Sequence, residues 1–78
     1  MRIDKFLKVS RVIKRRTVAQ EACTGGRITI NGKAVKPSKE VREGDVVTVA
    51  FGEGGITFRV TSVEPPKGKQ GNEMYELL

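Results

Sequence analysis

The chain has 78 residues, of which 37% are hydrophobic and 31% are charged, so it has room for one domain with one modest core. A separate catalytic domain is excluded at this length, and no apolar run approaches the roughly 18 residues of a membrane-spanning helix. The first residues alternate between charged and apolar side chains, unlike a secretory signal, so we expect the protein in the cytoplasm and away from membranes.

The formal net charge of +6 is concentrated at one end of the chain. Residues 1–16 contain seven Lys and Arg residues against Asp4 alone, whereas residues 17–78 contain eight basic and eight acidic residues. Clustered cations neutralise phosphates and release counterions, while a merely solvated surface mixes both signs. The distribution therefore favours a nucleic acid or another polyanion as the partner.

The first predicted helix covers Arg2–Lys8, where Ile3, Phe6 and Leu7 have the i, i+3, i+4 spacing of one buried face. A break is expected at Ser10. Up to that point the basic residues fall outside the apolar face, so the helix should be packed on one side and cationic on the other.

A second helix is predicted from about Lys14 to Thr24 and should end at Gly25 and Gly26 in a left-handed cap. Thr17 and Gln20 have the spacing of a capping box, but either of the two arginines before Thr17 is an equally good start, so this boundary is left open. The expected apolar stripe consists of Val18, Ala19, Ala22 and Cys23.

After the glycines the apolar period changes to two. Ile28–Ile30 and Lys33–Val35 flank the pair Asn31 and Gly32, which supplies the positive φ angles of a type I′ hairpin turn. The first strands of a small antiparallel sheet are therefore expected here.

A second hairpin is predicted from Val46–Phe51 and Ile56–Val63, with a glycine-rich reversal between them. Residues 65–72 contain two prolines, two glycines and no apolar side chain and are expected to form a loop before a short last strand at Tyr75–Leu78. The fold class is α+β, with two N-terminal helices packed on a small, mainly antiparallel sheet in one domain, residues 1–78. The predicted core is Ile3, Phe6, Leu7, Val18, Ala22, Ile28, Ile30, Val47, Val49, Phe51, Phe58 and Val60.

The connection between the helices carries Lys14, Arg15 and Arg16 near the start of the second helix. Free backbone N–H groups and the helix dipole attract anions there, and arginine holds phosphate oxygens in two-point contacts. Arg2 and Lys5 would extend the same patch. Short basic runs also serve solubility or localisation, which is the plainer interpretation of this triplet alone.

Aromatic side chains are few, and Phe6, Phe51 and Phe58 are expected in the core, leaving only Tyr75 half-exposed. Single-strand binders stack bases on exposed aromatics, so folded RNA read by its shape and backbone is the better ligand. A double-stranded DNA reader remains open, because one basic helix fits a major groove.

Nothing in the sequence points to catalysis, a metal or a cofactor. Histidine is absent, the carboxylates are scattered through predicted turns, and the glycine-rich stretch Gly52–Gly55 precedes a strand rather than the helix of a phosphate-binding loop. Cys23 is alone and is expected to act as a small buried apolar group. We therefore predict that the chain is not an enzyme.

Three stretches together resemble one family: R-I-D-K-F-L-K-V-S-R at Arg2–Arg11, K-R-R-T-V-A at Lys14–Ala19 and G-R-I-T-I-N-G-K-A-V-K-P-S at Gly26–Ser38, and the pattern continues through Val41 and G-D-V-V-T-V at Gly44–Val49. They are similar to the S-four-type (S4) RNA-binding domain, whose fold contains the alpha-L motif, and the likeness covers at least residues 2–51. Within that superfamily, the R-I-D-K-F-L opening without a catalytic domain resembles RqcP-like proteins of the heat-shock protein fifteen family. The chain ends without the long basic C-terminal extension of other members, which favours the RqcP-like group.

The resemblance implies binding to ribosomal RNA and tRNA on a large ribosomal subunit that carries an obstructed nascent chain, in support of ribosome quality control. It also implies assistance to an RqcH-type factor during alanine tailing, with the protein a monomer off the ribosome. Asp4 would orient Arg2 or another nearby cation, and Arg15 departs from the Ser or Thr common in the superfamily. The expected RNA-binding residues are Arg2, Lys5, Lys8, Arg11, Lys14, Arg15, Arg16, Thr17, Asn31, Lys33, Lys36 and Ser38.

A protein-interaction module, whose basic face meets an acidic patch on another protein, is the alternative from a different functional class. A small RNA-processing enzyme is a third and weaker one. The RNA-binding module and the protein-interaction module differ in whether the protein stays in a large complex after the RNA of that complex is digested.

Overall fold

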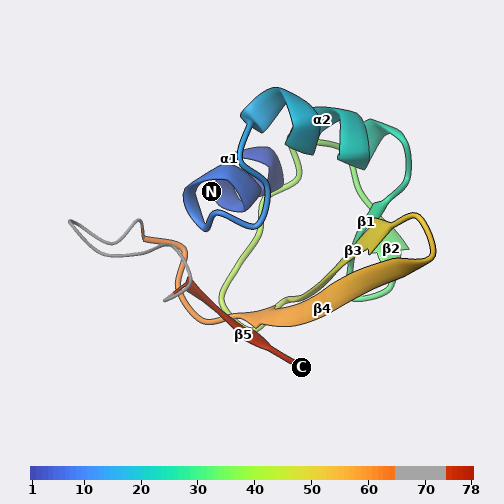
Figure 1. The fold of residues 1–78 in the computed structure, drawn as a ribbon. Coiled ribbons are helices and arrows are strands. Elements are labelled where there is room, and N and C mark those ends of the chain that lie inside the picture. The colour runs from blue at the N-terminus through green and yellow to red at the C-terminus, as the bar shows by residue number, and fades with distance from the viewer. Residues whose placement is uncertain (65–73) are drawn as a thin grey trace.

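The structure is a computed structural model and describes residues 1–64 and 74–78. Two helices lie on one face of a five-stranded antiparallel sheet, which confirms the predicted fold class (Figure 1). The elements are α1 (Ile3–Val9), α2 (Arg16–Thr24), β1 (Ile28–Ile30), β2 (Lys33–Ala34), β3 (Val46–Phe51), β4 (Gly54–Val60) and β5 (Tyr75–Leu77). The loop predicted at residues 65–72 lies outside the described residues.

The strand order is β2-β1-β3-β4-β5, and every neighbouring pair is antiparallel. Asn31 and Gly32 have φ angles of 52° and 85°, so the first hairpin turns with two residues in the left-handed region, as the Asn-Gly pair predicted. The strand Ile56–Val63 was predicted too late in the chain, because β4 begins at Gly54 and ends at Val60.

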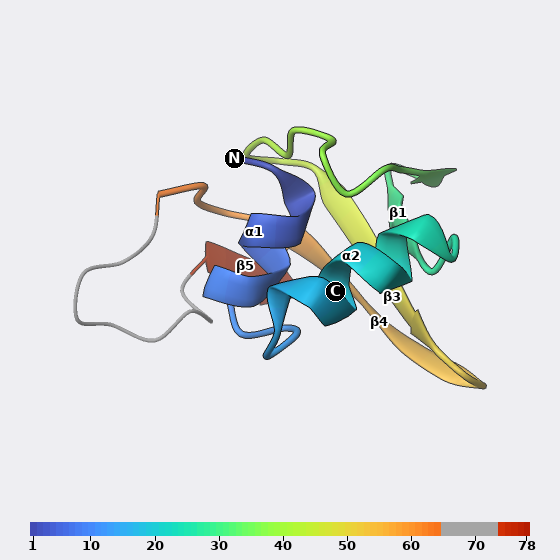
Figure 2. The same ribbon diagram turned by 90° about the horizontal axis from the view of Figure 1, so that it is seen from above.

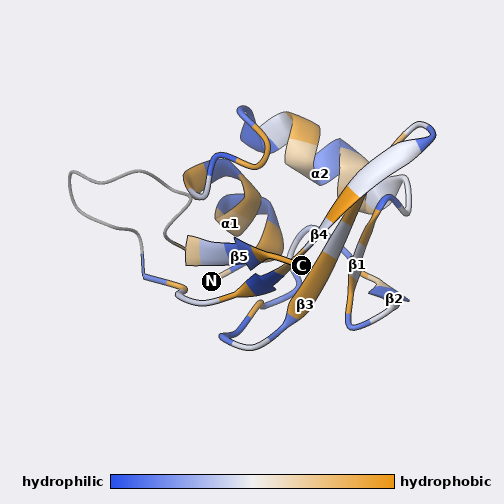
Figure 3. Ribbon diagram, turned by 60° about the horizontal axis from the view of Figure 1, so that its bottom comes forward, coloured by the Kyte–Doolittle hydropathy of each residue, from blue (hydrophilic) through white to orange (hydrophobic). Residues whose placement is uncertain are grey.

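The core fills the space between the helices and the sheet. Phe6 of α1 stacks on Phe58 of β4 with ring centroids 6.1 Å apart, and Phe58 contacts Tyr75 of β5 at 4.9 Å. Figure 3 shows the hydrophobic positions concentrated in α1, β1 and β3. Burying a large side chain of this kind stabilises the fold by about 1.5–3 kcal/mol. This layer therefore fixes α1 against the sheet.

Two residues were wrongly predicted to be buried in the core. Phe51 is 51% exposed and Val18 is 46% exposed. Phe51 shares the inward-facing side of β3 with Val47 and Val49, but it lies opposite Gly54 at the tip of the β3–β4 hairpin, which extends past the helices (Figure 2). Val18 lies at the edge of the apolar stripe of α2, about 100° around the helix from its centre. Ala19 and Cys23 of the predicted apolar stripe are buried as expected, and the core also contains three residues that no pattern had assigned to it: Ile13, Val41 and Met74.

α1 begins at Ile3, one residue later than predicted. α2 begins at Arg16, one of the two arginines left open as its start, because Arg15 is extended, with φ −119° and ψ 133°. The connection between the helices contains Arg11 at a φ of 65°, a left-handed conformation that no pattern predicted. Only Gly26 of the glycine pair takes the left-handed conformation, with a φ of 77°. The helices therefore meet through a tight irregular turn.

Neither helix in the described part of the chain is long and apolar enough to cross a bilayer.

Candidate nucleic-acid interface

Asp4 of α1 is a fully buried carboxylate at the centre of a cluster of donors. Arg2 approaches it in a two-point contact, with Nε 3.2 Å from Oδ1 and Nη2 3.0 Å from Oδ2. The backbone N–H of Lys5 donates to Oδ1 at 2.7 Å. The residue immediately before α1 is therefore held in place by a carboxylate in the first turn of that helix.

The second helix reaches the same carboxylate. Arg16 places Nε 3.3 Å from Oδ2 and Nη2 3.4 Å from Oδ1 of Asp4, and Gln20 donates through Nε2 to Oδ2 at 3.0 Å. Arg16 and Gln20 are four residues apart and so lie one above the other on α2. Gln20 contacts Asp4 and no side chain caps α2, so the capping box with Thr17 is not formed.

The Asp4 cluster, defined as Arg2, Asp4, Arg16 and Gln20, carries a surplus positive charge. Burial alone would raise the pKa of Asp4, but the hydrogen bonds from Gln20, Arg16 and the Lys5 N–H outweigh it and hold this pKa below 3.8. Asp4 is therefore ionised at neutral pH and balances one arginine of the two. The arginine side chains remain 50% and 43% exposed, so each offers further N–H donors to a ligand.

The segment after the first hairpin is attached to the start of α1. The Ile3 N–H donates to the Lys39 carbonyl at 2.7 Å, and the Asp4 N–H donates to the Pro37 carbonyl at 3.3 Å. These carbonyls occupy the free N–H groups of the helix end, so that end is closed to phosphate. The same contacts place the side chains of Lys36 and Ser38 close to Arg2.

A hollow of about 510 Å³ joins the cluster to this segment. Its lining consists of Arg2, Cys23, Thr24, Val35, Lys36, Pro37 and Ser38. We call the surface formed by Arg2, Arg16, Lys36 and Ser38 the cationic face. Four of the predicted RNA-binding residues, from three separate parts of the sequence, are thus brought together.

The remaining predicted residues divide into two groups. Those at or between the helices are exposed but make no ion pair with a described acidic residue, and of the basic triplet only Arg16 joins the cluster; these are Lys5, Lys8, Arg11, Lys14, Arg15 and Thr17. Asn31 donates through Nδ2 to Asp45 at 3.2 Å and accepts the Val46 N–H at 3.0 Å, so its amide already ties the hairpin to β3. Lys33 is exposed next to it.

Sequence reasoning missed Gln20 and Thr24 as parts of this surface. Both follow Arg16 at intervals of four residues, so a polar stripe along α2 was present in the sequence. The spacing of Thr17 and Gln20 indicated a helix cap, and this interpretation concealed the polar stripe.

The fold and the cationic face define the class of protein. The profile of the S4 domain, an RNA-binding module, matches residues 1–47. A Bacillus subtilis protein named "RQC P-site tRNA stabilizing factor" is 48% identical over this whole chain and 92% of its own length. The protein of the same name from Halalkalibacterium halodurans is 47% identical over 99% of this chain and 89% of its own length.

The structural comparison agrees. The heat-shock protein 15 structure from Vibrio cholerae superposes with a TM-score of 0.89 at 28% identity, over all of this chain and 81% of the other. The chain belongs to the S4 domain family and, within it, to the RqcP-like members of the heat-shock protein fifteen family.

Proposed function

We propose that this protein binds ribosomal RNA and tRNA on the large ribosomal subunit and supports ribosome quality control of stalled nascent chains, without catalysing a reaction. Relatives that match the chain over nearly its whole length are named for stabilising P-site tRNA, and that name does not describe an enzyme. Work on the large subunit implies residence in the cytoplasm.

The observation that carries this proposal is the convergence of Arg2 and Arg16 on Asp4. Two guanidinium groups held by one buried carboxylate form a preoriented pair of forks, the arrangement that suits phosphate oxygens on a folded backbone. Lys36 and Ser38 extend the surface on the other side of Arg2. RNA contacts by the remaining predicted cations, including Lys5, are part of the same proposal.

Salt dependence tests the binding mode. If four to six phosphates are neutralised, the slope of log K against log salt concentration should lie near −3 to −5, at roughly 0.7–0.9 per phosphate. The measurement is co-sedimentation of the protein with purified large subunits that carry peptidyl-tRNA, over a series of salt concentrations. Binding that does not respond to salt would contradict a phosphate-reading face.

Nuclease treatment separates RNA binding from the protein-interaction alternative. We expect the protein to leave its large complex when the ribosomes in an extract are digested before sedimentation. Retention in a large complex after digestion would favour an acidic protein partner for the cationic face.

The finer proposal is assistance to an RqcH-type factor during alanine tailing, with the protein a monomer when it is off the ribosome. In a reconstituted reaction with large subunits, peptidyl-tRNA and the RqcH-type factor, adding the protein should increase the number of alanines added. Tails of unchanged length, with the protein bound, would remove this step while leaving subunit binding in place.

A further inference from the structure

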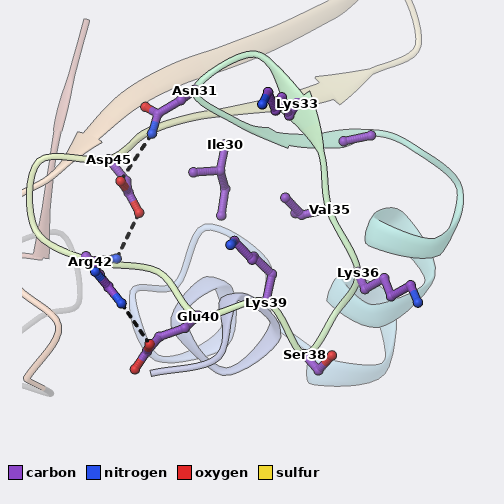
Figure 4. Close-up of a pocket in the computed structure, with 11 residues that line it drawn as sticks. Ile30, Asn31, Lys33, Val35, Lys36, Ser38, Lys39, Glu40, Arg42 and Asp45 are labelled. Carbon is purple, nitrogen blue, oxygen red and sulfur yellow. Dashed lines mark hydrogen bonds and ion pairs between the residues drawn. The ribbon is translucent and has the colours of Figure 1, made fainter.

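A second and larger hollow, of about 750 Å³, lies between the β1–β2 hairpin and the segment that leads to β3 (Figure 4). It shares Val35, Lys36 and Ser38 with the hollow beside Arg2, so the two are neighbours. Its volume falls in the range of small-ligand sites, roughly 300–1,000 Å³. Its other lining residues are Ile30, Asn31, Lys33, Ala34, Lys39, Glu40, Arg42 and Asp45.

Both walls of this hollow are fixed by hydrogen bonds. On one side the Lys39 carbonyl accepts the Ile3 N–H. On the other, Asp45 accepts hydrogen bonds from the Asn31 side chain at 3.2 Å and from the Arg42 N–H at 2.9 Å. A concave site whose walls are already in place loses little entropy when a ligand binds.

Two aliphatic side chains lie at the floor of the hollow. The side chains of Ile30 and Val35 point into the hollow, and the ammonium end of Lys39 extends toward them (Figure 4). Ile30 is 6% exposed, and Val35 packs partly against the core. The floor is therefore an aliphatic surface with a positive group beside it.

The charges at the rim leave a positive excess. Glu40 is engaged by Arg42 at 3.7 Å and by the N-terminal ammonium at 3.9 Å, and Asp45 is engaged by the hydrogen bonds above. Lys33, Lys36 and Lys39 have no carboxylate within 4.0 Å among residues 1–64 and 74–78. An anion at this rim would meet cations that the described protein has not neutralised.

We propose that this hollow binds one unpaired nucleotide of the RNA, with its base on Ile30 and Val35 and its phosphates beside Lys33 and Lys39. A bare phosphate would gain nothing from the aliphatic floor, whereas the flat face of a base would bury apolar surface against it. No aromatic side chain lines the hollow, so aliphatic contact replaces ring stacking, and Arg42, which is 80% exposed, offers a guanidinium plane of the kind on which unstacked bases lie. This inference rests on the proposed function and adds the class of RNA feature that is recognised.

The test uses free mononucleotides and nuclear magnetic resonance of the full chain with labelled methyl groups. Adenosine and uridine 5′-monophosphates should shift the methyl signals of Ile30 and Val35. They should bind about tenfold more tightly than ribose 5-phosphate, which lacks the base. Equal affinities, or unchanged methyl signals of Ile30 and Val35 when the nucleotides bind, would reduce the hollow to a phosphate contact and overturn the proposal.

Matched variants locate the site. Lys39→Ala should weaken mononucleotide binding severalfold, whereas Arg59→Ala, which removes the same charge from the opposite face of the sheet, should leave it unchanged. The same spectra show whether each variant is folded. If mononucleotides fail to shift Ile30 and Val35 while large subunits still bind, the nucleotide site is contradicted and the proposed function is not.

Discussion

The sheet and the helices handle their positive charges differently. On the sheet, Arg59 pairs with Glu76 at 3.3 Å, and both side chains are about half exposed. At the helices, Arg2 and Arg16 share Asp4, which is fully buried. The sheet pair is neutral, whereas the Asp4 cluster keeps one positive charge in excess.

This difference separates a neutralised surface from the proposed binding surface. An exposed ion pair contributes about 0–1 kcal/mol and fixes its partners loosely, because water competes for both groups. A buried carboxylate with several hydrogen bonds fixes the direction of its partners while their outer N–H groups remain free. Asp4 thus neutralises one of the two arginine charges and holds both arginines in a defined geometry.

The largest difference between the two regions should appear in RNA binding. Arg16→Ala should weaken binding to large subunits by about ten- to hundredfold, as expected for hydrogen bonds to charged groups worth about 1.5–3 kcal/mol. Arg59→Ala removes the same charge from the sheet and should change binding less than about twofold. Co-sedimentation at one fixed salt concentration measures both, and equal losses would mean that only net charge matters.

A second difference concerns folding stability. Asp4→Asn removes a buried charge from between two arginines and should lower the free energy of unfolding by about 2 kcal/mol; the loss stays moderate because both guanidinium groups can turn to water. Glu76→Gln breaks the exposed pair and should change it by less than about 0.5 kcal/mol. Urea titrations followed by circular dichroism give both values. Similar losses would contradict a special role for Asp4.

The stabilisation by Asp4 should also depend on pH. Its pKa is below 3.8 in the folded protein, so the unfolded chain takes up the proton first as the pH falls. The stability contributed by the carboxylate is complete above that value and is lost as the pH falls through the folded pKa. The stability gap between the natural protein and Asp4→Asn should therefore shrink in acid. A gap that stays constant well below pH 3.8 would argue against the cluster.

The smallest expected effect concerns Cys23, which lies behind the hollow beside Arg2. Burial, followed by the negative charge of Asp4, raises the pKa of this thiol to about 11. Alkylation near neutral pH should therefore be slow in the folded protein and fast in urea, since the thiolate is the reactive form. Rapid alkylation of the folded protein, followed by mass spectrometry, would show that the core opens at this point.

The sequence predicted the layers of the fold because they follow from local patterns. The i, i+3, i+4 spacing of Ile3, Phe6 and Leu7 identified α1, and the Asn31-Gly32 pair identified the first hairpin. Phe51 and Val18 were misjudged because alternation says which way a side chain points and not whether another element covers it. How far the β3–β4 hairpin extends past the helices is a property of the assembled fold.

The site was predicted in part. The excess of N-terminal cations was visible, and Asp4 was expected to orient Arg2 or another cation. The shared contact with Arg16 and Gln20 could not be derived, because it depends on the turn between the helices and on Arg11 at a φ of 65°. The hollow between Ile30 and Lys39 could not be derived either, since the path of the first hairpin and of the segment after it depends on their hydrogen bonds to β3 and α1.

Geometry and charge can be set against each other in one measurement. Asp4→Asn and Glu76→Gln both raise the formal net charge from +6 to about +7, so a surface that acts by charge alone should bind large subunits at least as tightly in both variants. We predict that Asp4→Asn, compared at a temperature where it is fully folded, binds several times more weakly than the natural protein, while Glu76→Gln does not. Equal or tighter binding by Asp4→Asn would contradict the claim that one buried carboxylate shapes the RNA-binding face.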